Sequence, residues 1–241
     1  MESKESHKSK CICIIPARGG SKRVKNKNIK ECNGKPLLYH TIVKARESGI
    51  FSRIIVNSEN DEILNIGRYY GAEGYRRPAE LSGDNILLID VIKEMLSALN
   101  LKDDVAVGIM LATSPLRNVT DIKDTWEIFL NNDIKTPVVS VTRYERPIHL
   151  ALAISEDNRL VPVFPREYLR TTRSQEHTMT FWYNGAIIFN TVMRLKKQEN
   201  LIGTEPIPYI MPFERSIDID HEFQFEYVKF LLNKDNKKEN I

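Results

Sequence analysis

Short apolar runs alternate along the chain with longer stretches in which apolar residues recur every three or four positions. The short runs predict strands, and the longer stretches, with their capping residues and first-turn acids, predict helices. We expect strands at 11–16, 54–57, 105–111, 137–142, 185–190 and 216–220. We expect helices at 36–48, 60–70, 86–99, 120–131 and 221–232. This alternation predicts an α/β fold whose sheet is mostly parallel, with right-handed crossovers.

The regular pattern is lost between residues 143 and 180, where proline, arginine and tyrosine are scattered. A structureless loop of that length is unusual in a compact domain. We therefore expect a single domain over 11–232 with an inserted lobe at about 143–180, which we interpret as a dimer arm. Residues 1–10 are expected to be disordered, and 233–241 to form a polar tail.

Charge is distributed unevenly along the chain. Residues 1–30 hold nine Lys or Arg and two Glu, whereas the rest of the chain has a net charge of −4. A positive segment on a mildly acidic body indicates a specific anion site, because nucleic-acid-binding proteins spread their basic residues over a face. Binders of single strands also stack bases on aromatic residues, and no Phe, Tyr or Trp occurs between residues 4 and 30. We therefore expect no nucleic-acid partner.

The cysteines and the apolar runs bear on the cellular compartment. There are three cysteines, and Cys11 and Cys13 lie two apart in an apolar run, so both point to one face of a strand. An odd count argues against a disulfide framework and favours buried structural thiols. The chain shows neither the apolar stretch of a signal peptide nor a run of roughly 18 apolar residues. We expect a cytoplasmic protein without a membrane partner.

The segment 16–28, PARGGSKRVKNKN, is the most informative stretch. It follows a predicted strand, which places it at the carboxyl edge of the sheet, where ligands bind in open α/β folds. Its two glycines let the backbone approach a ligand, and its lysines and arginines can neutralise phosphate oxygens. The spacing matches neither a P-loop nor a GxGxxG fingerprint. The residues alone leave open an anion-binding loop or a solvated basic turn.

A pair of acids near the end of the chain is a candidate metal site. Asp218 and Asp220 are separated by one residue, so in an extended segment both carboxylates point to the same face. Two hard oxygen ligands suit Mg²⁺, which takes one or two protein carboxylates together with phosphate and water. Asp220 could alternatively cap the helix predicted to follow it, and the two roles are compatible.

Five short blocks together carry a resemblance to a known family. ARGGSK, followed by Lys27-Asn28-Ile29, resembles the nucleotide-binding signature of the acylneuraminate cytidylyltransferases, including their legionaminate and pseudaminate relatives. The other blocks are RPAEL at 77–81, TSPLR at 113–117, NGA at 184–186 and SIDID at 216–220. They occur in the family's order and cover the chain from about 11 to 232. The resemblance implies a Rossmann-like fold of the nucleotide-diphospho-sugar transferase type with a small inserted dimerisation lobe, and hence a homodimer.

The resemblance also implies a reaction and roles for individual residues. CMP passes from CTP to the anomeric hydroxyl of an acidic nine-carbon sugar, and pyrophosphate leaves. The implied cofactor is Mg²⁺, with Mn²⁺ as the alternative, on Asp218 and Asp220. The implied catalytic residues are Arg18, Lys22 and Asp220. The implied CTP-binding residues are Ala17, Gly19, Gly20, Ser21, Lys27, Asn28 and Arg77, although Arg77 could instead pair with Glu80.

On the acceptor side the resemblance implies Leu111, Arg173 and Asn184, with Arg173 facing the sugar carboxylate. Phe181 and Trp182 either wall the sugar pocket or pack in the core. Leu111 departs from the family pattern, since many sialate enzymes have a glutamine nearby and a leucine cannot hydrogen-bond to a sugar hydroxyl. This departure favours a sugar with fewer free hydroxyls, such as legionaminate or pseudaminate. An alternative from a different class of protein is a non-catalytic nucleotide-binding protein that kept the fold.

Overall fold

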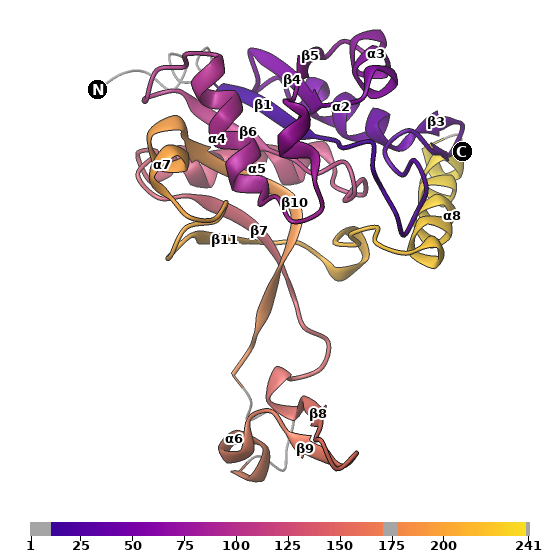
Figure 1. The fold of residues 1–241 in the computed structure, drawn as a ribbon, viewed down its shortest axis with the longest axis vertical. Coiled ribbons are helices and arrows are strands. Elements are labelled where there is room, and N and C mark those ends of the chain that lie inside the picture. Colours follow the sequence, from indigo (N-terminus) through magenta and orange to yellow (C-terminus); the bar gives the residue numbers. More distant parts are fainter. Residues whose placement is uncertain (1–10, 171–177, 240–241) are drawn as a thin grey trace.

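The computed structural model describes residues 11–170 and 178–239, so the expected disorder of residues 1–10 lies outside the described part. A seven-stranded sheet forms the centre of the molecule, in the order β11-β7-β10-β6-β1-β4-β5 (Figure 1). Its strands are β1 (Cys11–Pro16), β4 (Arg53–Ser58), β5 (Glu73–Arg76), β6 (Ala106–Ile109), β7 (Val138–Arg143), β10 (Phe181–Thr191) and β11 (Ile207–Ile210). All neighbouring pairs are parallel except those of β10, which is antiparallel to β6 and β7. The predicted mostly parallel sheet is confirmed.

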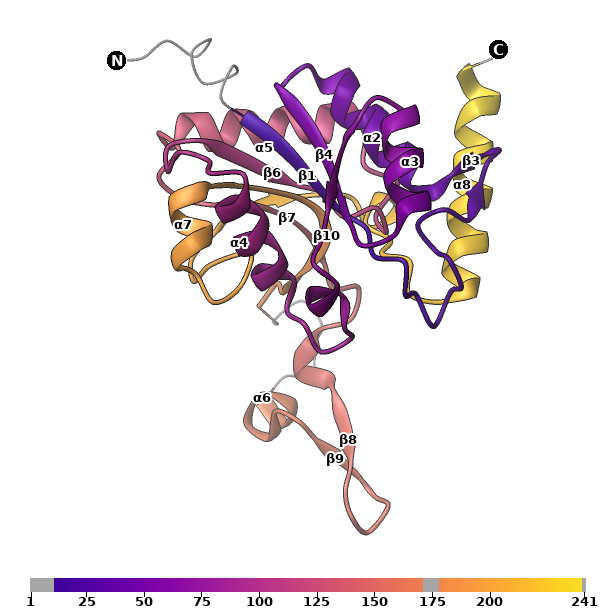
Figure 2. The same cartoon turned by 45° about the horizontal axis from the view of Figure 1, so that its top comes forward.

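Helices cover both faces of the sheet and produce three layers (Figures 1 and 2). One core cluster joins the sheet to α2 (Leu37–Ser48), α3 (Asp61–Tyr69) and α5 (Val119–Asn131). A second cluster joins the other face to α4 (Leu88–Ala98) and α7 (Val192–Lys197). The C-terminal helix α8 (Glu222–Glu239) packs to the side, near the short hairpin of β2 (Glu31–Cys32) and β3 (Lys35–Pro36). Among the described residues, no helix is long and apolar enough to cross a membrane.

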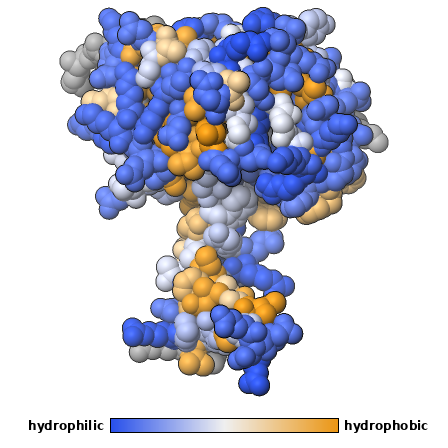
Figure 3. All heavy atoms as spheres, viewed as in Figure 1, coloured by the Kyte–Doolittle hydropathy of each residue, from blue (hydrophilic) through white to orange (hydrophobic). Residues whose placement is uncertain are grey.

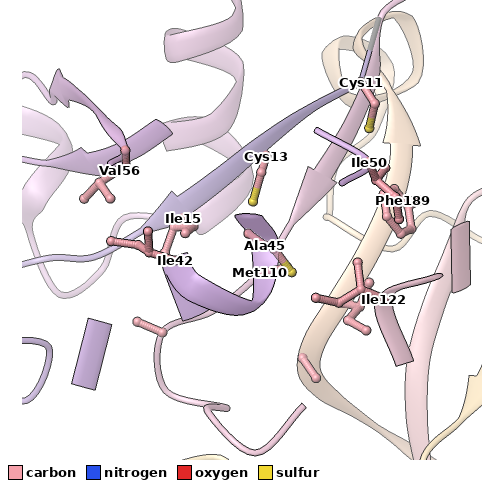
Figure 4. Close-up of a cluster of buried hydrophobic side chains, with 14 of the residues drawn as sticks. Cys11, Cys13, Ile15, Ile42, Ala45, Ile50, Val56, Met110, Ile122 and Phe189 are labelled. Atoms are coloured by element: carbon pink, nitrogen blue, oxygen red, sulfur yellow. The ribbon is translucent and has the colours of Figure 1, made fainter. Parts of the chain in front are cut away.

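The predicted strand at the start of the chain lies at the centre of the core. Cys11, Cys13 and Ile15 point to the face covered by α2 and α5, where they lie near Ile42 and Ile122 (Figure 4). Burial raises the pKa of both thiols above the ordinary cysteine value. All three cysteines of the chain are free and buried. The interpretation of these residues as structural thiols is confirmed.

Capping residues set the starts of two helices. Asn60 caps α3 by accepting a hydrogen bond from the amide of Ile63 (3.1 Å), as expected of an asparagine before a helix. The start of α5 was predicted at 120–121, but the capping residue is Asn118. Its side chain and that of Asp121 form a reciprocal capping box, which satisfies two backbone donors at once.

Residues 216–220 do not form the predicted final strand. The segment is irregular, and the last strand is instead β11, which pairs with β7. Ile219 is buried against α8, and its amide donates to the carbonyl of Thr113 (2.8 Å). The alternating pattern therefore belongs to an irregular segment in which Ser216 and Ile219 are buried, not to a strand paired in a sheet. The last helix also extends to Glu239 rather than to about 232, so part of the predicted polar tail is helical.

The segment between β7 and β10 projects away from the three layers (Figures 1 and 2). It contains the hairpin of β8 (Leu152–Ile154) and β9 (Leu160–Pro162), followed by α6 (Pro165–Arg170). Figure 3 shows apolar side chains gathered on its surface. We call residues 144–170 and 178–180 the lobe.

Candidate active site

A cavity of about 330 Å³ lies at the carboxyl edge of the sheet. Three segments surround it: the loop after β1, the residues between β5 and α4, and Leu111–Thr113 after β6. Asp220 closes it on the side of α8. Because parallel strands present their carboxyl ends at the same edge, loops far apart in the sequence meet here. Of the predicted site residues, the structure brings Arg18, Ser21, Lys22, Lys27, Asn28, Arg77, Leu111 and Asp220 to the cavity.

The loop after β1 is held by bonds to the neighbouring strand. The amide of Ala17 donates to the carbonyl of Asn57 (2.9 Å), and the side chain of Asn28 donates to the carbonyl of Arg18 (2.8 Å). Oδ1 of Asn28 is buried and has no hydrogen-bond partner in the described part of the chain. Asn28 therefore offers an unused acceptor beside the cavity, which suits a hydroxyl of a ligand.

The two glycines of this loop have different surroundings. Gly19 lies against the β4–α3 turn, and its amide donates to Oε1 of Glu59 (2.6 Å) instead of pointing to open space. Gly20 is exposed, with nothing near the position of a Cβ. Neither Ala17 nor the two glycines line the cavity. Their placement supports the loop, whereas the cavity is lined by the side chains that flank them.

The cations of the loop that line the cavity are matched by carboxylates. Nη1 of Arg18 lies 2.7 Å from Asp84, and Lys22 pairs with the other oxygen of the same carboxylate. Lys27 is largely buried, donates to the carbonyl of Ile219, and lies 3.6 Å from Asp220. Burial lowers the pKa of Lys27, while the nearby acids oppose this shift. The loop is therefore an array of cations held close together, which fits an anionic ligand.

Arg77 is buried and does not pair with Glu80. Its Nε donates to Oδ1 of Asn57 (2.7 Å) and its Nη2 to the carbonyl of the same residue (3.1 Å). Burial lowers the pKa of Arg77, and the charge of Glu59 partly compensates. These bonds fix the guanidinium at the wall of the cavity, where one of its edges can contact a ligand.

The two acids near α8 have unequal surroundings. Asp218 is mostly buried, and burial raises its pKa despite a hydrogen bond from Thr113. Its Oδ1 has no hydrogen-bond partner among the described residues. Asp220 is half-exposed and pairs with Arg23 (3.1 Å) as well as with Lys27.

The donor set of these two acids suits a divalent cation. A buried carboxylate oxygen without a partner beside a second carboxylate is a donor set that Mg²⁺ prefers, because this ion needs few protein ligands when phosphates supply the rest. No group of three or more His, Cys, Asp or Glu that could enclose a metal is found in residues 11–170 and 178–239. The chemistry of the pair therefore fits a divalent cation shared with a ligand, not one enclosed by protein.

The predicted acceptor residues do not lie together. Leu111 lines the cavity, and its backbone is fixed by bonds to the carbonyl of Gly185 (3.2 Å) and from the guanidinium of Arg117. Asn184 does not line the cavity, because its amide is buried and is bonded to Ser140 and Ser216. Arg173 lies outside the described residues.

Two aromatic residues named in the sequence prediction lie away from the cavity, and three charged residues that it did not name lie beside the basic loop. Phe181 and Trp182 belong to the antiparallel β10 and do not line the cavity. The sequence prediction did not select Arg23, Glu59 or Asp84. Arg23 lies within the basic segment and had that signal, whereas nothing local indicates that Glu59 and Asp84 meet this loop.

The chain is similar in sequence to a known protein family and in fold to solved structures. A sequence profile described as Cytidylyltransferase matches residues 12–229. A pseudaminic acid cytidylyltransferase from Campylobacter jejuni is 32% identical over 225 residues, which cover 92% of this chain and 96% of that protein. An N-acylneuraminate cytidylyltransferase from Escherichia coli is 31% identical over 231 residues, which cover 96% of this chain and 54% of that protein. The solved structure of a CMP:2-keto-3-deoxy-manno-octonic acid synthetase complexed with CTP has the same fold, with a TM-score of 0.70, 14% identity, and coverage of 94% of this chain and 99% of that one.

Proposed function

The chain belongs to the cytidylyltransferase family, and on that premise we propose that it transfers CMP from CTP to the anomeric hydroxyl of an acidic nine-carbon sugar, releasing pyrophosphate. The observation that carries the proposal is the meeting of Arg18, Lys22 and Lys27 with Asp220 at one cavity on the carboxyl edge of the sheet. A non-catalytic nucleotide-binding protein would need the cations but not a pair of carboxylates with an unused oxygen.

The residues of the cavity suggest how CTP would be held. Arg18 and Lys22 would bind the triphosphate, since both lie on the loop after β1 and present charged donors to the cavity. Arg77 and Asn28 would face the nucleoside, where the free acceptor of Asn28 suits a ribose hydroxyl. The sugar hydroxyl would attack the α-phosphorus in line with the departing pyrophosphate. Such transfers depend mainly on positioning and on neutralising charge, which this array of cations supplies.

Asp218 and Asp220 would hold Mg²⁺, with Mn²⁺ as the alternative. When bound, the ion would supply charge neutralisation for phosphate oxygens. Lys27 ties the acids to the basic loop, because it bonds to the backbone between them and lies near Asp220. The chain's own contribution is thus to keep two carboxylates and a lysine at a fixed distance from the triphosphate.

The apolar part of the cavity's lining suggests the kind of acceptor. Leu111, Leu81 and Ile86 contribute apolar side chains to this lining. An apolar wall does not hydrogen-bond to hydroxyls, so it favours a nonulosonic acid with deoxygenated carbons over one with a fully hydroxylated chain. The similarity to a pseudaminic acid cytidylyltransferase points in the same direction. We therefore propose pseudaminate or legionaminate as the first acceptors to test, with N-acylneuraminate as the alternative.

The assembly and the compartment are also proposals. The lobe exposes Ile154, Leu160 and Leu169, each by more than 60%, which is a large amount of apolar surface for a small hairpin and helix. We propose that two copies pair through their lobes to form a homodimer. We propose a cytoplasmic location because CTP is a cytoplasmic metabolite and all three cysteines are free thiols.

The test is pyrophosphate release from CTP and MgCl₂ with pseudaminate, legionaminate or N-acylneuraminate, against a control without sugar. Release with one sugar, abolished by EDTA, is expected. Asp220→Ala should lower turnover by about 100-fold or more, because charge neutralisation at the phosphates is lost, with a much smaller change in CTP affinity. Asp103→Ala is the matched control. In the described part of the chain the side chain of this exposed acid forms an ion pair only with Lys196. Asp103 precedes β6, so it lies at the opposite edge of the sheet from the cavity.

The outcomes distinguish a metal-dependent transferase from a non-catalytic nucleotide-binding protein. Normal turnover of Asp220→Ala at saturating CTP and Mg²⁺ would remove the metal pair from the mechanism. Binding of CTP without release of pyrophosphate for any acid sugar would favour the non-catalytic protein.

A further inference from the structure

Asp84 occupies an unusual position for an acid beside an anion site. One of its carboxylate oxygens lies 2.7 Å from Nη1 of Arg18, and the other pairs with Lys22. Asp84 belongs to the segment between β5 and α4, more than sixty residues from the basic loop. A single carboxylate thus bridges two cations across the mouth of the cavity that all three residues line.

This bridge uses the groups that a phosphate would use. Carboxylate and phosphate oxygens accept the same charge-assisted hydrogen bonds from guanidinium and ammonium groups. In the described part of the chain, Asp84 is the only acid that forms an ion pair with Arg18 or Lys22. A second carboxylate, that of Glu59, accepts from the amide of Gly19 on the same loop. The side chains of Arg18 and Lys22 and the amide of Gly19 are therefore engaged by the protein's own acids.

The segment that carries Asp84 can withdraw without disturbing the core. Residues 83–86 are exposed, and the backbone bond between them is a long one, from the amide of Ile86 to the carbonyl of Gly83 (3.4 Å). The next residue, Leu87, is tied to α4, because its carbonyl accepts from the amide of Asp90 (3.0 Å). Ion pairs between exposed side chains contribute little stability, so their exchange for a bound polyanion is easy. The ion pairs of Asp84 are therefore weak enough for a bound polyanion to displace them, and they occupy the same cations that the polyanion would use.

We propose that Asp84 is an intramolecular competitor for the triphosphate subsite. It pairs with Arg18 and Lys22 in the free protein, gives way when CTP binds, and pairs with them again when pyrophosphate leaves. The identity of the displaced anion rests on the proposed function, whereas the competition itself does not. Two cations strong enough to hold a triphosphate also retain pyrophosphate, so a competing carboxylate shortens the time that this product stays bound.

The test measures binding alone, in EDTA so that no metal contributes. Calorimetric dissociation constants for CTP and for pyrophosphate are compared between the wild type and Asp84→Asn, which keeps the shape and removes the charge. We expect both ligands to bind about three- to tenfold more tightly, from the loss of two exposed ion pairs that compete with them. Asp90→Asn is the control, since this exposed acid in the first turn of α4 forms no ion pair with Arg18 or Lys22, both of which the structure describes. It should change either constant less than twofold.

A second comparison separates direct pairing from the general effect of charge. In a Lys22→Met background the gain from Asp84→Asn should shrink, because half of the bridge is already absent. A gain that persists undiminished, an equal gain from Asp90→Asn, or weaker binding by Asp84→Asn would each overturn the proposal. Failure of the wild type to bind CTP would contradict the proposed function instead, and the pyrophosphate arm would still test Asp84.

Discussion

Single residues fix the shape of the loop that follows β1. Gly19 touches the turn between β4 and α3, and Asn60 in that turn is held in place because it caps α3. Asn28 spans the loop from the other side through its bond to Arg18. The loop is therefore braced at both ends, and the side chains between the braces keep their direction toward the cavity.

Gly19→Ala should destabilise this brace. A Cβ at this position would lie 3.0 Å from both Cβ and Nδ2 of Asn60, which cannot move without losing its cap. We expect a decrease in the free energy of unfolding of about 1–3 kcal/mol, together with weaker CTP binding. Urea unfolding and calorimetry measure the two effects. Gly20→Ala is the matched control, because nothing lies within 4 Å of its Cβ position, and equal losses in both variants would contradict the close-approach argument.

His40 makes the stability of the fold depend on pH. Its Nε2 lies 2.8 Å from the carbonyl of Cys32, and burial lowers the pKa of His40 below the ordinary value of 6.5. The unfolded chain therefore binds a proton at a higher pH than the folded chain does. The stabilisation is complete above about pH 7 and is lost as the pH falls below 6.5 through the lower folded-state pKa.

Urea midpoints at pH 7.5, 6.5 and 5.5 measure this dependence. His40→Gln should flatten the decrease between the first and last pH, because glutamine does not titrate and can still donate to the carbonyl. The exposed His221→Gln should leave the decrease unchanged. A pH profile for His40→Gln that superposes on that of the wild type would show that another group is responsible.

At the scale of elements, α5 anchors the segment that leads to the acid pair. Asp121 in the first turn of α5 is fully buried and accepts from Tyr209 of β11 (3.0 Å). It also accepts two bonds from Arg215 (2.7 and 3.1 Å), which directly precedes 216–220. One carboxylate thus joins a helix, an edge strand and the coil that carries Asp218 and Asp220.

Asp121→Ala should loosen all three elements. It leaves a half-buried arginine and a tyrosine hydroxyl without their acceptor and also removes the capping box, so we expect a loss of about 2–3 kcal/mol in unfolding free energy. Turnover should fall further than CTP affinity, because the displaced coil carries the acid pair. Asp124→Ala is the control, since Asp124 makes only a long bond to Tyr209 (3.4 Å) and is exposed. Equal stability of the two variants would exclude Asp121 as the anchor.

At the scale of the whole molecule, the fold separates a compact body from the projecting lobe. The body buries its strands between two helical layers and leaves the cavity at one edge. Two strands and a short helix make too small a core to be stable in water by themselves. The proposed homodimer would cover the exposed apolar residues of the lobe and enlarge this core.

Ile154→Glu should convert the proposed homodimer to a monomer. The side chain of Ile154 is 71% exposed on β8, so a charge there costs little in an isolated chain but would be buried in a dimer. Light scattering at assay concentration should report half the mass of the wild type. Tyr69→Glu is the control on the body, where the ring is 82% exposed on α3, and it should leave the mass unchanged. A monomeric wild type would end the dimer proposal.

Local patterns were sufficient for most elements of the body. The apolar run 11–16, the helix near 36–48, the capped helix near 60–70 and the basic segment after the first strand all have the predicted place. They could be predicted because their signals are local: burial of a whole strand, a cap before a helix, and the rule that loops after parallel strands meet at one edge. Five short motifs in a fixed order also indicated the protein family to which the chain belongs.

Tertiary contacts decided the rest. The alternation at 216–220 is typical of a strand, but the segment is irregular and its backbone bonds to the loop after β6, where the amide of Ile219 donates to the carbonyl of Thr113. Asn184 belongs to a family motif, yet its hydrogen bonds are taken by two serines of other segments. The bridge from Asp84 to Arg18 and Lys22 has no local signal, because it depends on how two loops from different strands are brought together. Sequence by itself determined that a basic loop and an acidic residue meet at the carboxyl edge, because their signals are local. Only the packed structure brought in the acids of other loops and decided which groups pair with one another.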